Sequence, residues 1–211
     1  MLDDIATTAV EGAAGSKKNG NKLHDWGSTI AIIILAPLIA LLLTNFVFQS
    51  YQVDGPSMET TLQDKDRLIV SKTAKTWSRV TNKDYLPKRY SIIIFNLIEG
   101  QDGEKRQLVK RVIGLPGDRV VVKDGVVRVY NNEHPQGYLI DQEGPEKDVI
   151  SSTSGPGERE IDETVKDGYV YVMGDNRGNS LDSRSFGAVP SKDIVGRLDY
   201  RIFPFDKFEK F

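Results

Sequence analysis

Ser57 and Lys110 are the two residues of this sequence whose types and surroundings best suit covalent chemistry. Ser57 lies in the turn-forming stretch 53–58 (VDGPSM), and Lys110 opens the block 110–118 (KRVIGLPGD). A third block, 174–184 (GDNRGNSLDSR), follows later in the chain. A serine hydroxyl becomes a useful nucleophile once a base takes its proton, and a neutral lysine amine can be that base. The pair therefore suggests a serine nucleophile activated by lysine rather than by histidine.

A free lysine is charged at neutral pH, so the surroundings of Lys110 decide whether it can act as a base. If residues 107–113 form a strand, Leu108, Lys110 and Val112 share one face. Burial between two aliphatic side chains lowers the pKa of a lysine. From spacing alone, a plain turn at Ser57 and a surface lysine at position 110 are the more common interpretations.

The composition narrows the remaining classes of chemistry. The chain has 211 residues, no cysteine and a formal charge of -2, so thiol chemistry is excluded and nothing favours nucleic-acid binding. A Ser-His-Asp triad would have to use His134, because His24 precedes the long apolar segment. His134 lies next to Pro135 in a predicted surface turn, where a solvated role is expected. We expect no metal and no cofactor.

A long apolar segment precedes Ser57. No charged residue occurs between Asp25 and Asp54, and the apolar centre Ile30–Phe48 would span about 29 Å as a helix. Trp26 and Tyr51 flank it, as aromatic residues do at membrane surfaces. A cleaved secretory signal is the alternative, but its apolar region would be only about 7–15 residues long. The pattern therefore favours a retained anchor.

The chain divides by composition into a tail, an anchor and one folded domain. Residues 1–25 are rich in Gly, Ala, Asn and Lys and are predicted to be a disordered cytoplasmic tail. We predict a transmembrane helix at 26–50 and a β-rich domain at 51–211, with an excursion or long loop over 141–168 and little helix. The expected fold is mainly β, an antiparallel multi-sheet domain after one N-terminal transmembrane helix. The predicted strands are Arg67–Ser71, Ser91–Asn96, Gln107–Ile113, Arg119–Lys123, Val126–Tyr130, Tyr169–Met173 and Gly196–Phe203.

Ser57-Met58 and the blocks 110–118 and 174–184 resemble, in the same order, the sequence boxes of bacterial type I signal peptidases. The resemblance reaches from the anchor to near the C-terminus and is poor in the tail and at 131–168. It implies a membrane-anchored serine endopeptidase with a Ser-Lys dyad, which removes signal peptides from exported preproteins after a small-x-small motif. Ser57 would then be the nucleophile and Lys110 the general base. The implied partners are signal peptides and the lipid bilayer.

The third block supplies the supporting residues that this resemblance implies. Ser180 matches a serine that hydrogen-bonds the lysine and orients it. Four charged residues match positions that support the site, and we expect them to form a salt-bridge network that holds Ser180 in place and transfers no proton: Asp175, Arg177, Asp182 and Arg184.

The sequence departs from the family pattern at three places. Gly55 stands where some members carry a serine that helps form the oxyanion hole, so backbone N–H groups are expected there, Ser57 first and Gly55 beside it. Pro56 has no N–H to contribute. Thr60 stands in place of a proline, and Tyr90-Ser91 in place of a Gly-Asp pair; both departures are expected to affect only turn geometry.

Substrate and membrane contacts are predicted at two further regions. Val53 and Val109 match residues that line narrow substrate pockets, although ordinary core valines are an equal alternative. A small aliphatic pocket would reject large side chains by steric clash. The basic and aromatic segment 72–90 either contacts lipid headgroups or forms a solvated face.

The implied location is the cytoplasmic membrane, single-pass, with the catalytic domain on the extracytoplasmic side. Three lysines precede the anchor, and Lys65 and Arg67 follow it, so the charge asymmetry alone is small. Two alternatives stay open. One is a self-cleaving protein of the LexA type, for which a DNA-binding domain is missing. The other is a membrane-anchored binding or scaffold protein of the same fold that has lost turnover.

Overall fold

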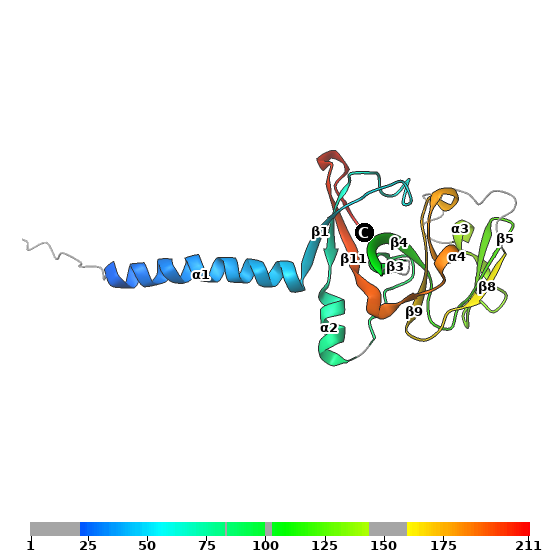
Figure 1. The fold of residues 1–211 in the computed structure, drawn as a ribbon, viewed down its shortest axis with the longest axis horizontal. Coiled ribbons are helices and arrows are strands. Elements are labelled where there is room, and N and C mark those ends of the chain that lie inside the picture. The colour runs from blue at the N-terminus through cyan, green and yellow to red at the C-terminus, as the bar shows by residue number, and fades with distance from the viewer. Residues whose placement is uncertain (1–21, 83, 100–102, 144–159) are drawn as a thin grey trace, which may run out of the picture. The chain divides into compact units, whose positions relative to one another are not determined.

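A computed structural model describes residues 22–82, 84–99, 103–143 and 160–211 (Figure 1). Its first element is α1 (Lys22–Phe46), in which Trp26–Phe46 is long and apolar enough to cross a membrane, with a mean hydropathy of 2.4. The helix starts four residues before the predicted position 26 and ends four residues before position 50. It ends at Phe46 because Phe48–Gln52 forms strand β1, which pairs with β2 (Arg67–Ser71). The predicted tail at 1–21 lies outside the described residues.

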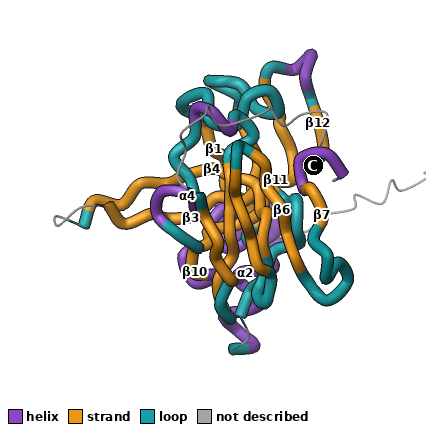
Figure 2. Tube along the Cα trace, turned by 90° about the vertical axis from the view of Figure 1, so that its right-hand side faces the viewer, coloured by secondary structure: helices purple, strands orange, loops and turns teal. Residues whose placement is uncertain are grey.

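The rest of the described chain is dominated by antiparallel strands (Figure 2). One eight-stranded sheet has the order β1-β2-β11-β3-β4-β9-β10, with β12 paired to β11; a second has the order β7-β6-β5-β8. The predicted fold class, a mainly antiparallel multi-sheet protein with an N-terminal apolar helix, is confirmed. The further elements are α2 (Thr73–Thr81), β3 (Ile92–Glu99), β4 (Glu104–Gly114), β5 (Arg119–Lys123), β6 (Val126–Tyr130), β7 (Tyr138–Leu139), α3 (Ile140–Glu143), β8 (Ile161–Thr164), β9 (Tyr169–Met173), α4 (Ser183–Phe186), β10 (Val189–Pro190), β11 (Ile194–Phe203) and β12 (Glu209–Lys210).

All seven predicted strands are present, and four of them, β2, β5, β6 and β9, have the predicted bounds. In β2, β5 and β6 buried residues alternate with less buried ones, which is the pattern of a sheet with one covered face, whereas β9 is buried at its last four positions. The Asp124-Gly125 turn joins β5 and β6 with positive φ at both residues, as a type I′ hairpin turn requires.

Two regions were predicted incorrectly. The region 141–168 is not a continuous loop, because α3 ends within it and Ile161–Thr164 pairs with β5 as strand β8; residues 144–159 lie outside the described residues. Helix α2 was not expected, because its three threonines have low helix propensity. Its stability comes from contacts with the rest of the domain, described below.

Three buried clusters hold the sheets together. One cluster fills the space between the four-stranded sheet and strands β4 and β9, and a second lies under β3, β9 and β10. The third contains Val53, Met58, Leu62, Leu68, Ile92 and Leu198. This third cluster lies beneath the loop that carries Ser57, so the position of that loop is set by the core.

Candidate active site

Ser57 lies in the loop that connects β1 and β2. The loop is fixed from below by Met58 and Leu62, both fully buried. It is fixed from the side by Asn176, whose backbone N–H donates to the Ser57 carbonyl oxygen at 3.1 Å and whose amide Nδ2 donates to the Pro56 carbonyl oxygen at 3.2 Å. Asn176 lies inside the third sequence block but was not predicted as a site residue; its position between Asp175 and Arg177 was the available signal.

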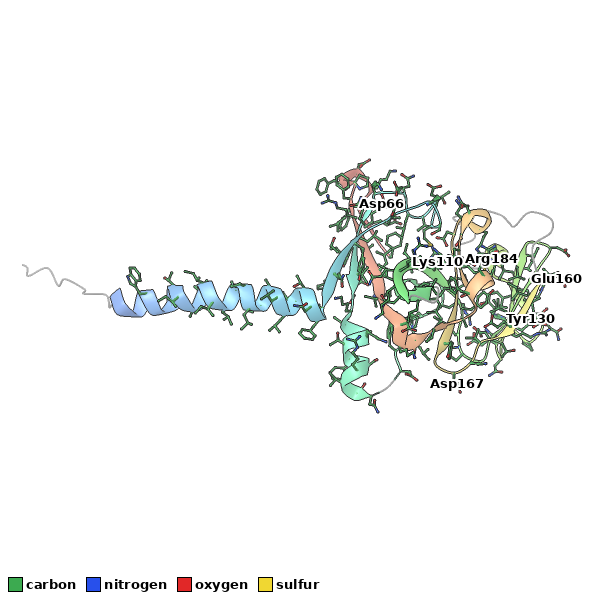
Figure 3. All side chains as sticks on the ribbon, viewed as in Figure 1. Asp66, Lys110, Tyr130, Glu160, Asp167 and Arg184 are labelled. Carbon is green, nitrogen blue, oxygen red and sulfur yellow. The ribbon has the colours of Figure 1, made fainter. Side chains whose placement is uncertain are left out.

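Lys110 lies on β4 (Figure 3), and its side chain reaches Ser57. Its side chain is buried, and Nζ donates to Ser57 Oγ at 2.8 Å and to the Val109 carbonyl oxygen at 2.9 Å. Burial lowers the pKa of Lys110 to about 8, against a weaker upward pull from Asp182 and Asp175. At pH 7 about a tenth of the amine is therefore neutral, far more than for a free lysine, and it adjoins the hydroxyl that it would deprotonate.

Ser180 reaches the site without making the predicted hydrogen bond. Within the described part of the chain, its buried Oγ has no hydrogen-bond partner. The Lys110 amine instead contacts Ser57 Oγ and the Val109 carbonyl oxygen. A Cβ added to Gly174 would lie 2.2 Å from Ser180 Oγ and 2.4 Å from the Ser57 carbonyl oxygen. Because position 174 has no side chain, the loop that carries Ser57 and the segment that carries Ser180 can approach each other.

The predicted charged residues form a bonded network around the same loop. Asp182 accepts a hydrogen bond from the Gly174 N–H at 3.0 Å and pairs with Arg184 at 2.9 Å. Arg184 Nη2 donates to the Arg177 carbonyl oxygen at 2.6 Å, and Arg177 Nε donates to the Gly174 carbonyl oxygen at 3.0 Å. These bonds join residues within the segment 174–184 to one another. The network therefore fixes the position of Ser180, which lies in that segment.

Asp175 connects this segment to the other two parts of the site. It forms two hydrogen bonds with Arg111, Nε to Oδ1 at 2.8 Å and Nη2 to Oδ2 at 2.6 Å, and both side chains are buried. Thr61 Oγ1 donates to Asp175 Oδ2 at 2.5 Å. The Ser57 loop, strand β4 and the segment 174–184 are thus joined by one buried ion pair. Thr61 and Arg111 were not predicted in this role, because nothing local indicates a partner so distant in sequence.

The two backbone N–H groups predicted to bind the oxyanion, those of Gly55 and Ser57, differ in their hydrogen bonding. The Gly55 N–H donates to Asp64 Oδ1 at 3.0 Å, so it is already engaged. The Ser57 N–H has no hydrogen-bond partner among the described residues. Gly55 has a φ of +95°, a conformation that side chains rarely adopt, which accounts for glycine at this position.

A pocket with a volume of about 100 Å³ opens beside Ser57 and Lys110. Both valines predicted to line a substrate pocket, Val53 and Val109, lie in its wall, and Val53 also belongs to the third buried cluster. The other wall residues come from the same two segments, 51–54 and 107–110, and from Leu68 and Ile94.

Comparison with known proteins identifies the family. The family described as "Signal peptidase, peptidase S26" matches residues 25–203. Similar proteins include a signal peptidase I of Bacillus amyloliquefaciens, 36% identical over 92% of this chain and 95% of its own, and signal peptidase I P of Bacillus subtilis subsp. natto, 37% identical with the same coverages. A solved structure of a signal peptidase I from Enterococcus faecalis is 28% identical, with a TM-score of 0.38, over 54% of this chain and 97% of its own.

The chain therefore belongs to the signal peptidase family, peptidase S26. The predicted enzyme class, a type I signal peptidase acting as a serine endopeptidase, is confirmed by this match. The LexA-type alternative is not supported, since the match to the signal peptidase family starts at residue 25 and includes the apolar helix.

Proposed function

We propose that this protein is a membrane-anchored signal peptidase in which Ser57 attacks the peptide bond and Lys110 is the general base. The observation that carries the proposal is the 2.8 Å contact between Lys110 Nζ and Ser57 Oγ, made by a lysine that is only 2% exposed. A buried amine adjoining a hydroxyl can accept its proton once the amine is neutral. The lowered pKa of Lys110, about 8, makes that state accessible.

The proposed reaction has two steps on the same serine. Ser57 Oγ bonds to the scissile carbonyl carbon while Lys110 takes the hydroxyl proton and then delivers it to the departing amine. The acyl group on Ser57 is hydrolysed by water, whose proton passes to Lys110 and then to Ser57 Oγ. The Ser57 N–H is the proposed donor to the oxyanion, since the Gly55 N–H is bonded to Asp64.

Ser180 and the charged network are proposed as positioning residues. Asp182, Arg184 and Arg177 hold the segment that carries Ser180, while Asp175 fixes it to Arg111 on the strand of Lys110. We assign no proton transfer to these charged groups, because each is engaged in a hydrogen bond or ion pair that a proton transfer would break.

The proposed substrate binds in an extended conformation along β4. Strand β9 pairs with β4 from Arg111 to Gly114, and no other described strand pairs with the β4 edge before Lys110 on that side. An extended peptide could add to this edge with its side chains directed into the pocket between Val53 and Val109. A pocket of about 100 Å³ suits Ala, Gly or Ser, consistent with a small-x-small cleavage motif.

The proposed location is the cytoplasmic membrane, with a single span and the peptidase domain outside the cytoplasm. The apolar stretch Trp26–Phe46 is long enough to serve as the span. From Phe48 to Ser57 the chain can extend by at most about 30 Å. Ser57 therefore stays close to the outer membrane surface, where the end of a signal peptide would emerge.

The test is cleavage of a labelled preprotein by the full-length protein in vesicles. Ser57→Ala and Lys110→Ala are each expected to abolish cleavage. Ser50→Ala and Lys166→Ala, which remove an exposed serine and an exposed lysine away from the β4 edge, serve as matched controls and should cleave normally. Mass spectrometry of the products should place the cut after a small-x-small sequence. Substantial cleavage by either site variant would reject the dyad, and inactivity of the unchanged protein would favour a binding or scaffold role.

A further inference from the structure

The start of helix α2 is bonded to the residues at which the apolar helix ends. The Lys72 N–H donates to the Val47 carbonyl oxygen at 2.7 Å, and Thr76 Oγ1 donates to the Phe46 carbonyl oxygen at 2.9 Å. Lys72 Nζ also donates to the Asn45 carbonyl oxygen at 3.4 Å. The last carbonyls of a helix lack partners within the helix, and here α2 and the residue before it supply them. This end of α2 is therefore held where the apolar segment stops.

The opposite side of α2 is fixed to the body of the domain. Lys75 is 8% exposed, and its Nζ donates to the Ser191 carbonyl oxygen at 2.8 Å and to the Lys192 carbonyl oxygen at 3.0 Å. In both views of the domain, α2 lies at its lower end (Figure 1, Figure 2). These bonds fix the rotation of the helix about its own axis, and so fix which residues point outward.

The outward face of α2 carries two large apolar side chains. Trp77 and Val80 are 69% and 74% exposed. Residues three apart lie on the same face of a helix, whereas Lys75 lies on the other side. Arg79, exposed in the last turn, adds a positive charge beside them. An exposed tryptophan and valine with basic neighbours is the composition of a helix lying in a membrane interface.

We propose that α2 lies on the bilayer surface, with Trp77 and Val80 inserted at the level of the lipid headgroups. The occupant of this face is lipid because α2 is bonded to residues 45–47, where the apolar helix leaves the membrane. The inference rests on one part of the proposed function, that α1 spans the bilayer. With α2 on the bilayer surface, the domain would have a second attachment to the membrane besides α1.

Tryptophan quenching tests this directly, because the chain has only two tryptophans, Trp26 and Trp77. The full-length Trp26→Phe protein is reconstituted in vesicles of phosphatidylcholine and phosphatidylglycerol, with or without bromine near the carbonyl end of the acyl chains. Trp77 is expected to lose about half of its emission to the brominated lipid, since such helices insert about 5–10 Å. The control carries Val126→Trp in a Trp26→Phe, Trp77→Phe background, at the exposed β5–β6 hairpin, and should not be quenched.

Each outcome decides the question. Quenching of Trp77 but not of the control supports the proposal. If Trp26, measured in Trp77→Phe, is quenched and Trp77 is not, the anchor stands and the interfacial role of α2 is overturned. If neither is quenched, the anchor and the role of α2 both fail. Equal quenching of Trp77 and the control, or a blue shift of Trp77 without quenching, indicates non-specific adsorption or a protein contact such as a second copy, and overturns the proposal. Quenching does not depend on cleavage, so failure of the proposed Ser57–Lys110 chemistry would leave the quenching of Trp77 unchanged.

Discussion

The pH dependence of cleavage is the most direct measure of whether Lys110 is the base. Burial lowers the pKa of Lys110 from 10.5 to about 8. At pH 7 roughly a tenth of the lysine would then be neutral, about 300 times more than for a free lysine. We therefore expect kcat/KM to rise about tenfold per pH unit below pH 8 and to level off above it, for an overall increase of about 90-fold from pH 6 to pH 9.

The assay uses a soluble peptide substrate without groups that titrate in this range, cleaved by the full-length protein in detergent. Using kcat/KM matters because it reports the ionisation of the free enzyme. Ser57→Ala, measured at every pH, shows any activity from a contaminating protease. A flat profile from pH 6 to 9 would refute lysine as the base. A tenfold rise per unit that continues to pH 10 would show that Lys110 is not desolvated as its burial indicates.

Three further predictions concern the surroundings of the dyad. Because Lys110 binds its proton less tightly when folded, its burial costs stability below pH 8, and this cost disappears as pH rises to 10.5; Lys110→Met should therefore stabilise the fold at pH 7 by about 3 kcal/mol in urea unfolding, with no gain from this source near pH 11. Gly174→Ala places a Cβ 2.2 Å from Ser180 Oγ and should lower both thermal stability and kcat, whereas normal kcat would show that this loop adapts freely. Arg184→Gln leaves Asp182 without its cation, so the rising limb of the pH profile should move to higher pH; an unmoved limb would contradict this.

The sheets could be predicted from the sequence because their signals are local. The valine-rich alternation in 119–123 and 126–130, with Asp124-Gly125 between them, is sufficient to define a hairpin. Helix α2 could not be predicted in this way, since nine residues with three threonines have no strong intrinsic preference for a helix. It is held by Lys75, Thr76 and the residue before it, through bonds to parts of the chain far away in sequence.

The same distinction applies to the site. Ser57 and Lys110 were predicted from sequence blocks, and the structure brings them into contact. The partner of Asp175 could not be predicted, because Arg111 is separated from it by 64 residues and nothing in either segment specifies the pairing. That Ser180 Oγ has no hydrogen-bond partner among the described residues is likewise a matter of side-chain orientation, which a residue type does not determine.

The two carboxylates that raise the pKa of Lys110 show how the charged network would suit the proposed lysine base. An unpaired carboxylate close to a lysine favours the ammonium form and raises the pKa of the amine. Asp182 and Asp175 act in this direction on Lys110, but each is paired with a guanidinium, Arg184 and Arg111 respectively. The arginines offset the negative charge while the same carboxylates hold the loops by hydrogen bonds. Desolvation therefore stays the larger effect, so the structure that positions the dyad also leaves its amine able to take a proton.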